Sequence, residues 1–247
     1  MIKGCGDLRI AMCPERLQME SKTRISGVTG VILAGGSSSR MGSNKALLPF
    51  KGSLFIEAIC RRMERLFDEV LLVTNEPEQY PFLTCRKVAD RFAGMGPLAG
   101  IHAGLLEASN PRILALACDM PYVNDEIIRF LVELDEHADV TIPRSKDGLE
   151  PLHALYSKRC LSAMEDMLVS GRKRIISFFD RVTVLEVAPE IMPKFAPSFS
   201  VFWNVNTPED YYRLREEEHL ELGRSLRSQL CGAGYVTIRR ETKKRIC

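Results

Sequence analysis

The chain has 247 residues, of which 45% are hydrophobic and 27% are charged, a balance typical of a globular protein with a substantial core. No apolar run approaches the roughly 20 residues that a membrane helix needs, and the N-terminus lacks the apolar stretch of a secretory signal. The composition therefore argues against a membrane protein and predicts a soluble, cytoplasmic one.

The net charge of +2 is unevenly distributed along the chain. Residues 224–247 carry a net charge of +6 and residues 1–27 carry +2, which leaves −6 for the body between them. A nucleic-acid-binding protein is expected to spread basic residues over its folded surface, whereas here the basic residues belong to a tail. We therefore expect no nucleic-acid partner.

The eight cysteines are scattered and include no C-x-x-C pair. They are Cys5, Cys13, Cys60, Cys85, Cys118, Cys160, Cys231 and Cys247. This distribution favours reduced thiols and no cysteine metal site.

The hydrophobic pattern changes at Val28, where short apolar runs begin to alternate with amphipathic segments. Such alternation is typical of βαβ units. We expect an α/β fold, a three-layer α/β/α Rossmann-like domain with a mostly parallel central sheet, over residues 28–222. Residues 1–27 and 223–247 are expected to be flexible extensions.

Strands are expected wherever a short apolar run occurs. In chain order these runs are Val28–Ala34, Val70–Thr74, Lys87–Ala89, Ile113–Ala117, Val140–Pro143, Leu152–Tyr156, Val182–Val187 and Val201–Trp203. His102 and His153 lie in otherwise apolar surroundings and are expected to belong to the core.

Helices are expected between these strands. They are the segments Phe55–Leu66, Leu98–Ala108, the residues after Asn124, Ser157–Ser170 and Thr207 to about Leu222. Ser53 and Asn124 are suitable N-caps, and Gly171 is suited to ending a helix. The run Thr207-Pro208-Glu209-Asp210 combines a capping hydroxyl, a proline and two acids near the positive end of the helix dipole.

The first predicted strand leads into a loop rich in glycine and serine. The loop reads Gly35-Gly36-Ser37-Ser38-Ser39-Arg40-Met41-Gly42-Ser43-Asn44-Lys45. Ligands of open α/β sheets bind beyond the carboxyl ends of the strands, and glycines let backbone N–H groups approach a phosphate. Arg40 and Lys45 add positive charge, which a plain surface turn does not require. The loop matches neither the P-loop nor the dinucleotide-binding fingerprint.

With this loop the sequence begins to resemble the molybdenum cofactor guanylyltransferases, over roughly residues 28–218. The matching stretches are Leu33-Ala34-Gly35-Gly36, Arg40-Met41-Gly42, Lys45-Ala46-Leu47-Leu48, Gly96-Pro97-Leu98-Ala99-Gly100-Ile101, Cys118-Asp119-Met120-Pro121, Glu150-Pro151-Leu152-His153-Ala154-Leu155-Tyr156 and Asn204-Val205-Asn206-Thr207-Pro208-Glu209-Asp210. The opening loop alone is shared with many nucleotidyltransferases. One departure is Asn44, where the family usually has Asp.

The resemblance implies transfer of GMP from GTP to the terminal phosphate of molybdopterin, with release of pyrophosphate, in molybdenum cofactor biosynthesis. It implies GTP and molybdopterin as partners, with molybdoenzymes or their chaperones as further ones. Arg40, Lys45 and Asp119 would be catalytic. The nucleotide would be bound by Leu33, Ala34, Gly35, Gly36, Arg40, Gly42, Lys45, Asn75, Asp90 and Asp119.

Asp119 follows the strand Ile113–Ala117 and is expected to face the mouth of the sheet. An exposed carboxylate beside phosphates is suited to Mg²⁺, an ion that keeps several waters and takes few protein ligands. The alternative role for Asp119 is to cap the turn before Pro121. For Asn75 and Asp90 the alternative is turn formation after strands.

Asn204 and Asn206 are expected on one face at the end of the last strand. In similar proteins such residues lie near the metal and the acceptor, so we expect them to bind the acceptor. An asparagine turn before the Thr207 cap is the alternative.

Two other functions stay open from the sequence. A molybdenum cofactor cytidylyltransferase or related nucleotidyltransferase would share the fold and differ in a few base contacts. A nucleotide-binding regulatory module without turnover is the other, and Asn44 is the residue that keeps it open.

Overall fold

The computed structural model describes residues 24–35, 44–134, 137–191, 199–218 and 220. Most of the two predicted extensions lies outside these ranges, as do Gly36, Arg40 and Gly42 of the glycine-rich loop. Ile25 is buried and forms an isolated bridge with Phe67, so the packed chain includes residues before Val28.

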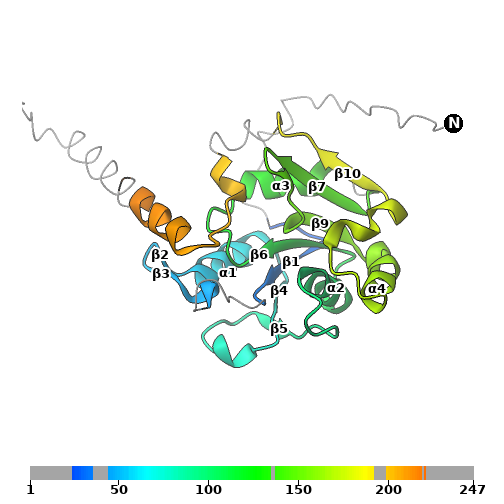
Figure 1. Ribbon diagram of the computed structural model, residues 1–247, viewed down its shortest axis with the longest axis horizontal. Coiled ribbons are helices and arrows are strands. Elements are labelled where there is room, and N and C mark those ends of the chain that lie inside the picture. Colours follow the sequence, from blue (N-terminus) through cyan, green and yellow to red (C-terminus); the bar gives the residue numbers. More distant parts are fainter. Residues whose placement is uncertain (1–23, 36–43, 135–136, 192–198, 219, 221–247) are drawn as a thin grey trace, which may run out of the picture.

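The central sheet has eight strands, in the order β10-β7-β9-β6-β1-β4-β5, with β8 paired to β7 (Figure 1). Their bounds are β1 Val28–Leu33, β4 Val70–Val73, β5 Arg86–Val88, β6 Arg112–Ala117, β7 Val140–Ser145, β8 Gly148–Leu149, β9 His153–Ser157 and β10 Val184–Val187. The sheet is parallel except where β9 pairs with β6 and β7, and where β8 pairs with β7. A separate antiparallel hairpin joins β2 (Pro49–Phe50) to β3 (Ser53–Leu54).

Helices cover both faces of the sheet, which confirms the predicted three-layer α/β fold. The α-helices are α1 Phe55–Leu66, α2 Pro97–Glu107, α3 Asp125–Leu134 and α4 Leu161–Val169, with a further helix over 208–218. Helices α1 and α3 share one apolar core with the sheet, and α2 and α4 share the other. Short 3₁₀ turns occur at Lys45–Leu47, Pro77–Gln79, Lys158–Cys160, Ile175–Arg181 and Phe199–Phe202. No helix among the described residues is long and apolar enough to span a bilayer.

Helix ends follow the capping signals in the sequence, with one exception. Asn124 caps α3 by accepting a hydrogen bond from the N–H of Ile127 at 3.0 Å. Gly171 follows α4 with φ +77°, the left-handed conformation that glycine tolerates. Ser53, however, is not the N-cap of α1. That position is Leu54, whose N–H donates to the Glu57 carboxylate at 2.9 Å, while the Ser53 hydroxyl donates to the carbonyl of Phe50.

The predicted strand at Val201–Trp203 is wrong, because its first residues belong to the 3₁₀ turn Phe199–Phe202. Two side chains of this run pack against aromatic rings, and the run does not pair with a strand. Phe202 packs edge-on against the ring of His153, with centroids 5.1 Å apart, and Trp203 stacks on Tyr122. An apolar run of three residues does not distinguish these outcomes.

Strand β1 lies inside the sheet, between β6 and β4, and its six residues are all buried. Helix α2 approaches the strand closely because Gly104 has no side chain. A Cβ at Gly104 would lie 2.8 Å and 3.1 Å from the two γ-methyl groups of Val31. A Cβ at Gly100, one turn earlier, would lie 3.1 Å from a δ-methyl of Leu33.

We predict that Gly104→Ala lowers the free energy of unfolding by about 1–3 kcal/mol, because Val31 is fully buried and branched at Cβ and cannot rotate away. Gly100→Ala is the matched control, since it brings the same gain in helix propensity and meets only the end of a flexible leucine. Chemical denaturation of both variants measures the difference. Equal stabilities would show that the Gly104 contact does not limit the approach of α2.

His153 is fully buried in β9, and neither ring nitrogen has a hydrogen-bond partner among the described residues. Burial lowers the pKa of His153 to about 4. His102 is also buried, and burial lowers its pKa too. Both histidines therefore belong to the core, as predicted.

Acid should destabilise the protein through His153. The unfolded chain takes up this proton as the pH falls through about 6.5, whereas the folded chain takes it up only near pH 4. Stability is therefore lost between these values, by up to about 3 kcal/mol. Unfolding of His153→Leu should depend less on pH across this window than that of the wild type. Val169→Ala, which changes an exposed side chain that does not titrate, is the control and should keep the wild-type slope.

Candidate active site

Of the nine predicted site residues that the structure describes, six lie where four adjacent parallel strands end. In the order of the sheet, Asp90 follows β5, Asn75 follows β4, Ala34 follows β1 and Asp119 follows β6. The chain passes from β1 outward to β4 and β5 and then returns to β6 on the other side of β1. This reversal is the topological switch point at which open α/β sheets bind their ligands.

The ends of these strands are held in register by backbone hydrogen bonds. The N–H of Cys118 donates to the carbonyl of Leu33 at 3.1 Å, and the N–H of Ala34 donates to the carbonyl of Val73 at 2.9 Å. Leu33 and Ala34 are buried, whereas Gly35 is exposed and has open space where a Cβ would point. The backbone thus reaches the surface at Gly35, where the glycine-rich loop begins.

Lys45, Asp119 and Asn206 are brought together from distant parts of the chain. The Lys45 ammonium donates to the side-chain oxygen of Asn206 at 2.7 Å and lies 3.9 Å from a carboxylate oxygen of Asp119. The N–H of Val205 donates to the carbonyl of Asp119 at 3.0 Å, which fixes residues 203–206 against the loop after β6. A cation, a carboxylate and an amide therefore meet at one point beside the end of β1.

The Asp119 carboxyl is partly withdrawn from water, with 21% of its side chain exposed. Burial raises its pKa above the ordinary value, and the neighbouring Lys45 ammonium opposes this rise. Burial also raises the pKa of the adjacent Cys118 thiol to about 12, with the Asp119 charge adding to the effect. Cys118 is therefore a neutral thiol. A further cation beside Asp119 would stabilise the ionised form of its carboxyl group.

Asn44 has a structural role that the sequence did not reveal. Its side-chain oxygen accepts from the N–H of Ala46 at 3.0 Å, which caps the 3₁₀ turn Lys45–Leu47. Its side-chain amide donates to the side-chain oxygen of Gln79 and, at 2.8 Å, to the hydroxyl of Tyr80. Asn44 thereby connects the backbone next to Lys45 to the segment between β4 and β5.

Asn75 and Asp90 form a reciprocal pair. The Asn75 amide donates to an Asp90 carboxylate oxygen at 2.7 Å, and the Asp90 N–H donates to the Asn75 side-chain oxygen at 3.0 Å. The other carboxylate oxygen of Asp90 is buried and has no partner among the described residues. This oxygen is an available acceptor for the N–H or O–H groups of a ligand.

An aromatic cluster that sequence reasoning missed positions Asn206. Trp203 stacks on Tyr122 with ring centroids 6.4 Å apart, and Tyr122 packs edge-on against Phe50 of the β2–β3 hairpin. Tyr211, on the helix over 208–218, donates its hydroxyl to the carbonyl of Pro49 at 3.0 Å. These aromatic residues are far apart in sequence and follow no common period, so no local pattern could have revealed their contacts.

The strand-end residues have donors that suit Mg²⁺. Asp119 supplies one carboxylate, and the side-chain oxygen of Asn204 is buried without a partner among the described residues. A magnesium ion that keeps most of its waters needs few protein ligands. No group of three or more His, Cys, Asp or Glu side chains suited to a metal occurs in the described part of the chain, so this ion would depend on substrate phosphates as well.

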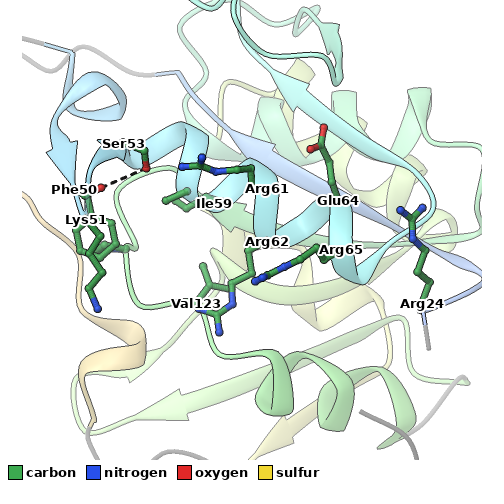
Figure 2. A pocket seen from close by; sticks show the side chains of 12 residues that line it. Arg24, Phe50, Lys51, Ser53, Ile59, Arg61, Arg62, Glu64, Arg65 and Val123 are labelled. Carbon is green, nitrogen blue, oxygen red and sulfur yellow. Dashed lines mark hydrogen bonds between the residues drawn. The ribbon is translucent and has the colours of Figure 1, made fainter. Parts of the chain in front are cut away.

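A separate recess of about 620 Å³ lies over α1 and contains none of the predicted site residues (Figure 2). Its charged side chains are Arg24, Lys51, Arg61, Arg62, Glu64 and Arg65. We call it the basic groove. It reaches the loop after Asp119 only at Pro121 and Val123.

The fold and this arrangement of residues are those of an α/β domain that handles phosphorylated substrates at the carboxyl edge of its sheet. The chain belongs to the family of the MobA-like NTP transferase domain, whose model matches residues 30–184.

Relatives with more specific names match over most of their length. A "Probable molybdenum cofactor guanylyltransferase" of Pelotomaculum thermopropionicum is 41% identical over 76% of this chain and 91% of its own length. The "Molybdenum cofactor guanylyltransferase" of Desulfosudis oleivorans is 35% identical over 75% and 93%. The molybdopterin-guanine dinucleotide biosynthesis protein A of Archaeoglobus fulgidus has a similar structure, with a TM-score of 0.69 and 27% identity over 76% of this chain and 97% of that one.

We predict that Trp203→Ala lowers the turnover of the transferase roughly 10–100-fold, because residues 204–206 lose the stacking that holds them beside Lys45. Tyr212→Ala, at an exposed position on the following helix, is the matched control and should leave turnover unchanged. Steady-state rates of the folded variants test this. Equal rates for Trp203→Ala and the wild type would mean that the aromatic cluster does not position the site.

Proposed function

We propose that the chain transfers GMP from GTP to the terminal phosphate of molybdopterin and releases pyrophosphate. The observation that carries this proposal is the meeting of Lys45, Asp119 and Asn206 at the ends of β1 and β6, in a chain of the MobA-like family. The names of its relatives support guanine as the base and the molybdenum cofactor as the acceptor.

In this proposal the nucleotide lies across the ends of β5, β4 and β1. The backbone at Leu33, Ala34 and Gly35 passes beneath it, and the Asn75–Asp90 pair presents a buried carboxylate oxygen. That acceptor is suited to the N–H groups of a purine edge or to ribose hydroxyls. Gly36, Arg40 and Gly42 would bind the phosphates and lie outside the described residues.

Lys45 would act on the phosphates. Its ammonium donates to Asn206 at 2.7 Å and lies 3.9 Å from Asp119, and its flexible side chain could exchange these neighbours for a phosphate. Phosphoryl and nucleotidyl transfer depend on positioning and charge neutralisation, so a cation is needed where charge develops. The acceptor phosphate is already ionised at neutral pH and needs no general base.

Asp119 would hold Mg²⁺, with Asn204 as a further oxygen donor. The ion, when bound, supplies charge neutralisation at the phosphates. Asp119 itself contributes a carboxylate whose charge is poorly solvated and is therefore stabilised by a cation. Asn204 and Asn206 would orient the acceptor phosphate beside Lys45.

Two alternatives differ from this proposal, one in the base of the nucleotide and the other in the absence of turnover. A cytidylyltransferase would use the same residues and differ in the base. A regulatory module without turnover was suggested by Asn44, but the contacts of Asn44 give it a structural function that an enzyme also needs.

A molybdoenzyme or its chaperone would receive the product. The basic groove over α1 carries five cationic side chains and one carboxylate, so its charge would suit a partner that presents an acidic face. A cytoplasmic location stays a prediction from the sequence.

The first experiment supplies the purified chain with Mg²⁺, molybdenum cofactor and, separately, GTP, CTP or ATP, and follows pyrophosphate release. We expect turnover with GTP alone, and we expect a chelator to abolish it. Preference for CTP would overturn the assignment of the base. Tight nucleotide binding without pyrophosphate release from any of the three would favour the alternative that the chain is a nucleotide-binding regulatory module without turnover.

Asp119→Asn tests the metal-binding role in the same assay. It keeps the shape of the side chain and removes its charge, so turnover should fall at least about 100-fold while the protein stays folded. Asp68→Asn is the control, because Asp68 is an exposed acid paired with Arg24. Wild-type turnover in Asp119→Asn would contradict the assigned role.

A further inference from the structure

Two cysteines that lie 25 positions apart in the sequence are in contact in the fold. The Cys60 thiol, on the inner side of α1, points to the Cys85 sulfur at 3.4 Å. Both side chains are buried, and both are free thiols. A disulfide has a sulfur–sulfur distance of about 2 Å, so a small approach would join the two residues.

The two thiols differ in chemical character. The hydrogen bond from Cys60 lowers the pKa of Cys85 below that of an ordinary thiol, and the same hydrogen bond, with burial, raises the pKa of Cys60. Lys87 also lowers the pKa of Cys85. Cys85 is therefore the better nucleophile of the pair, since the thiolate is the reactive form.

A carboxylate stands beside the pair. Glu64, one turn after Cys60 on α1, lies 3.8 Å from the Cys60 sulfur and accepts a hydrogen bond from the Thr84 hydroxyl at 3.1 Å. Figure 2 shows Glu64 on α1, on a different side of the helix from Arg62. Glu64 can accept the proton that Cys60 must lose before its sulfur can form a bond.

Cys85 lies in the connection between β4 and β5, next to exposed residues. Its neighbours Thr84 and Arg86 are exposed, and Phe82 is 43% exposed. The connection from β4 to β5 is anchored in the core by Tyr80 and Leu83, but its regular structure is only the 3₁₀ turn Pro77–Gln79 and its internal backbone hydrogen bonds are local. We therefore expect it to open more readily than α1. Cys60 lies on a regular helix and stays covered. An oxidant should therefore reach Cys85 first.

We propose that Cys60 and Cys85 are a site of reversible oxidative modification, at which a low-molecular-weight disulfide such as oxidised glutathione converts the two thiols into one disulfide. The Cys85 thiolate attacks one sulfur of the oxidant, forms a mixed disulfide and releases one thiolate. Cys60 then gives its proton to Glu64 and attacks the Cys85 sulfur, which expels the second thiolate. This thiolate takes up the proton that Cys60 gave to Glu64 and leaves as a thiol. The two electrons lost by the protein reduce the oxidant to two thiols.

The product would join α1 to the strand at the edge of the sheet. Cys85 directly precedes β5, and β5 leads to Asp90 of the candidate active site. The segment that ends at Cys85 also carries Gln79 and Tyr80, the partners of Asn44. A crosslink here would restrain the whole connection between β4 and β5 and would raise the midpoint of thermal unfolding.

The test treats the intact chain with oxidised glutathione, alkylates the remaining thiols under denaturing conditions and maps the peptides by mass spectrometry. We expect a peptide pair linked through Cys60 and Cys85, a loss of about tenfold in alkylation of both residues, and full reversal by dithiothreitol. Cys160, a buried free thiol that donates to the carbonyl of Asp139, is the internal control and should stay alkylatable.

Two variants test the order of the steps. Cys60→Ser should stop at a single glutathione adduct on Cys85, because the second thiol is missing. Cys85→Ser should leave Cys60 unmodified. Full alkylation of Cys60 and Cys85 after the oxidant, or modification of Cys60 in Cys85→Ser at the wild-type rate, would overturn the proposal.

Discussion

The candidate site depends on the burial of β1 between two helix layers. All six residues of this strand are buried, and its neighbours β4 and β6 run parallel to it with their ends in register. Register in a parallel sheet determines which residues emerge together at the carboxyl edge. The backbone bonds from Cys118 to Leu33 and from Ala34 to Val73 carry this register to the last residue of the strand.

A second constraint comes from the C-terminal part of the domain. The bond from Val205 N–H to the Asp119 carbonyl and the aromatic cluster place residues 203–206 beside the strand ends. Lys45 and Asn206 can therefore touch although neither belongs to a strand of the sheet. The site consists of a rigid half, supplied by the sheet, and a docked half, supplied by a segment with little regular structure.

The fold was largely predictable because its signals are local. Apolar runs located seven of the eight predicted strands, and the Asn124 and Gly171 signals located helix ends, since each reflects only a few neighbouring residues. The strand predicted at Val201–Trp203 failed because three apolar residues in a row say nothing about which partner covers them. Which residues would cluster at the strand ends also followed from topology, once the strands were known.

The contacts within the site could not be predicted from the residues alone. The Lys45–Asn206 bond, the ties from Asn44 to Gln79 and Tyr80, and the Cys60–Cys85 contact all join segments that no periodic pattern relates. The family resemblance indicated most of the residues of the candidate site, but it did not indicate which of them are in contact. The hydrogen bonds of Asn44 give this residue a structural role that neither the motif nor the composition indicated.

The hydrogen bond between Lys45 and Asn206 spans 161 positions of the chain. Contacts of such long range close large loops, which costs more conformational entropy than the local contacts within a βαβ unit. During synthesis the ends of β1, β4 and β6 can therefore assemble before residues 203–206 emerge from the ribosome. A growing chain would acquire the sheet edge first and the groups proposed to orient the acceptor last, so the residues of the proposed nucleotide site could assemble before those of the proposed acceptor site.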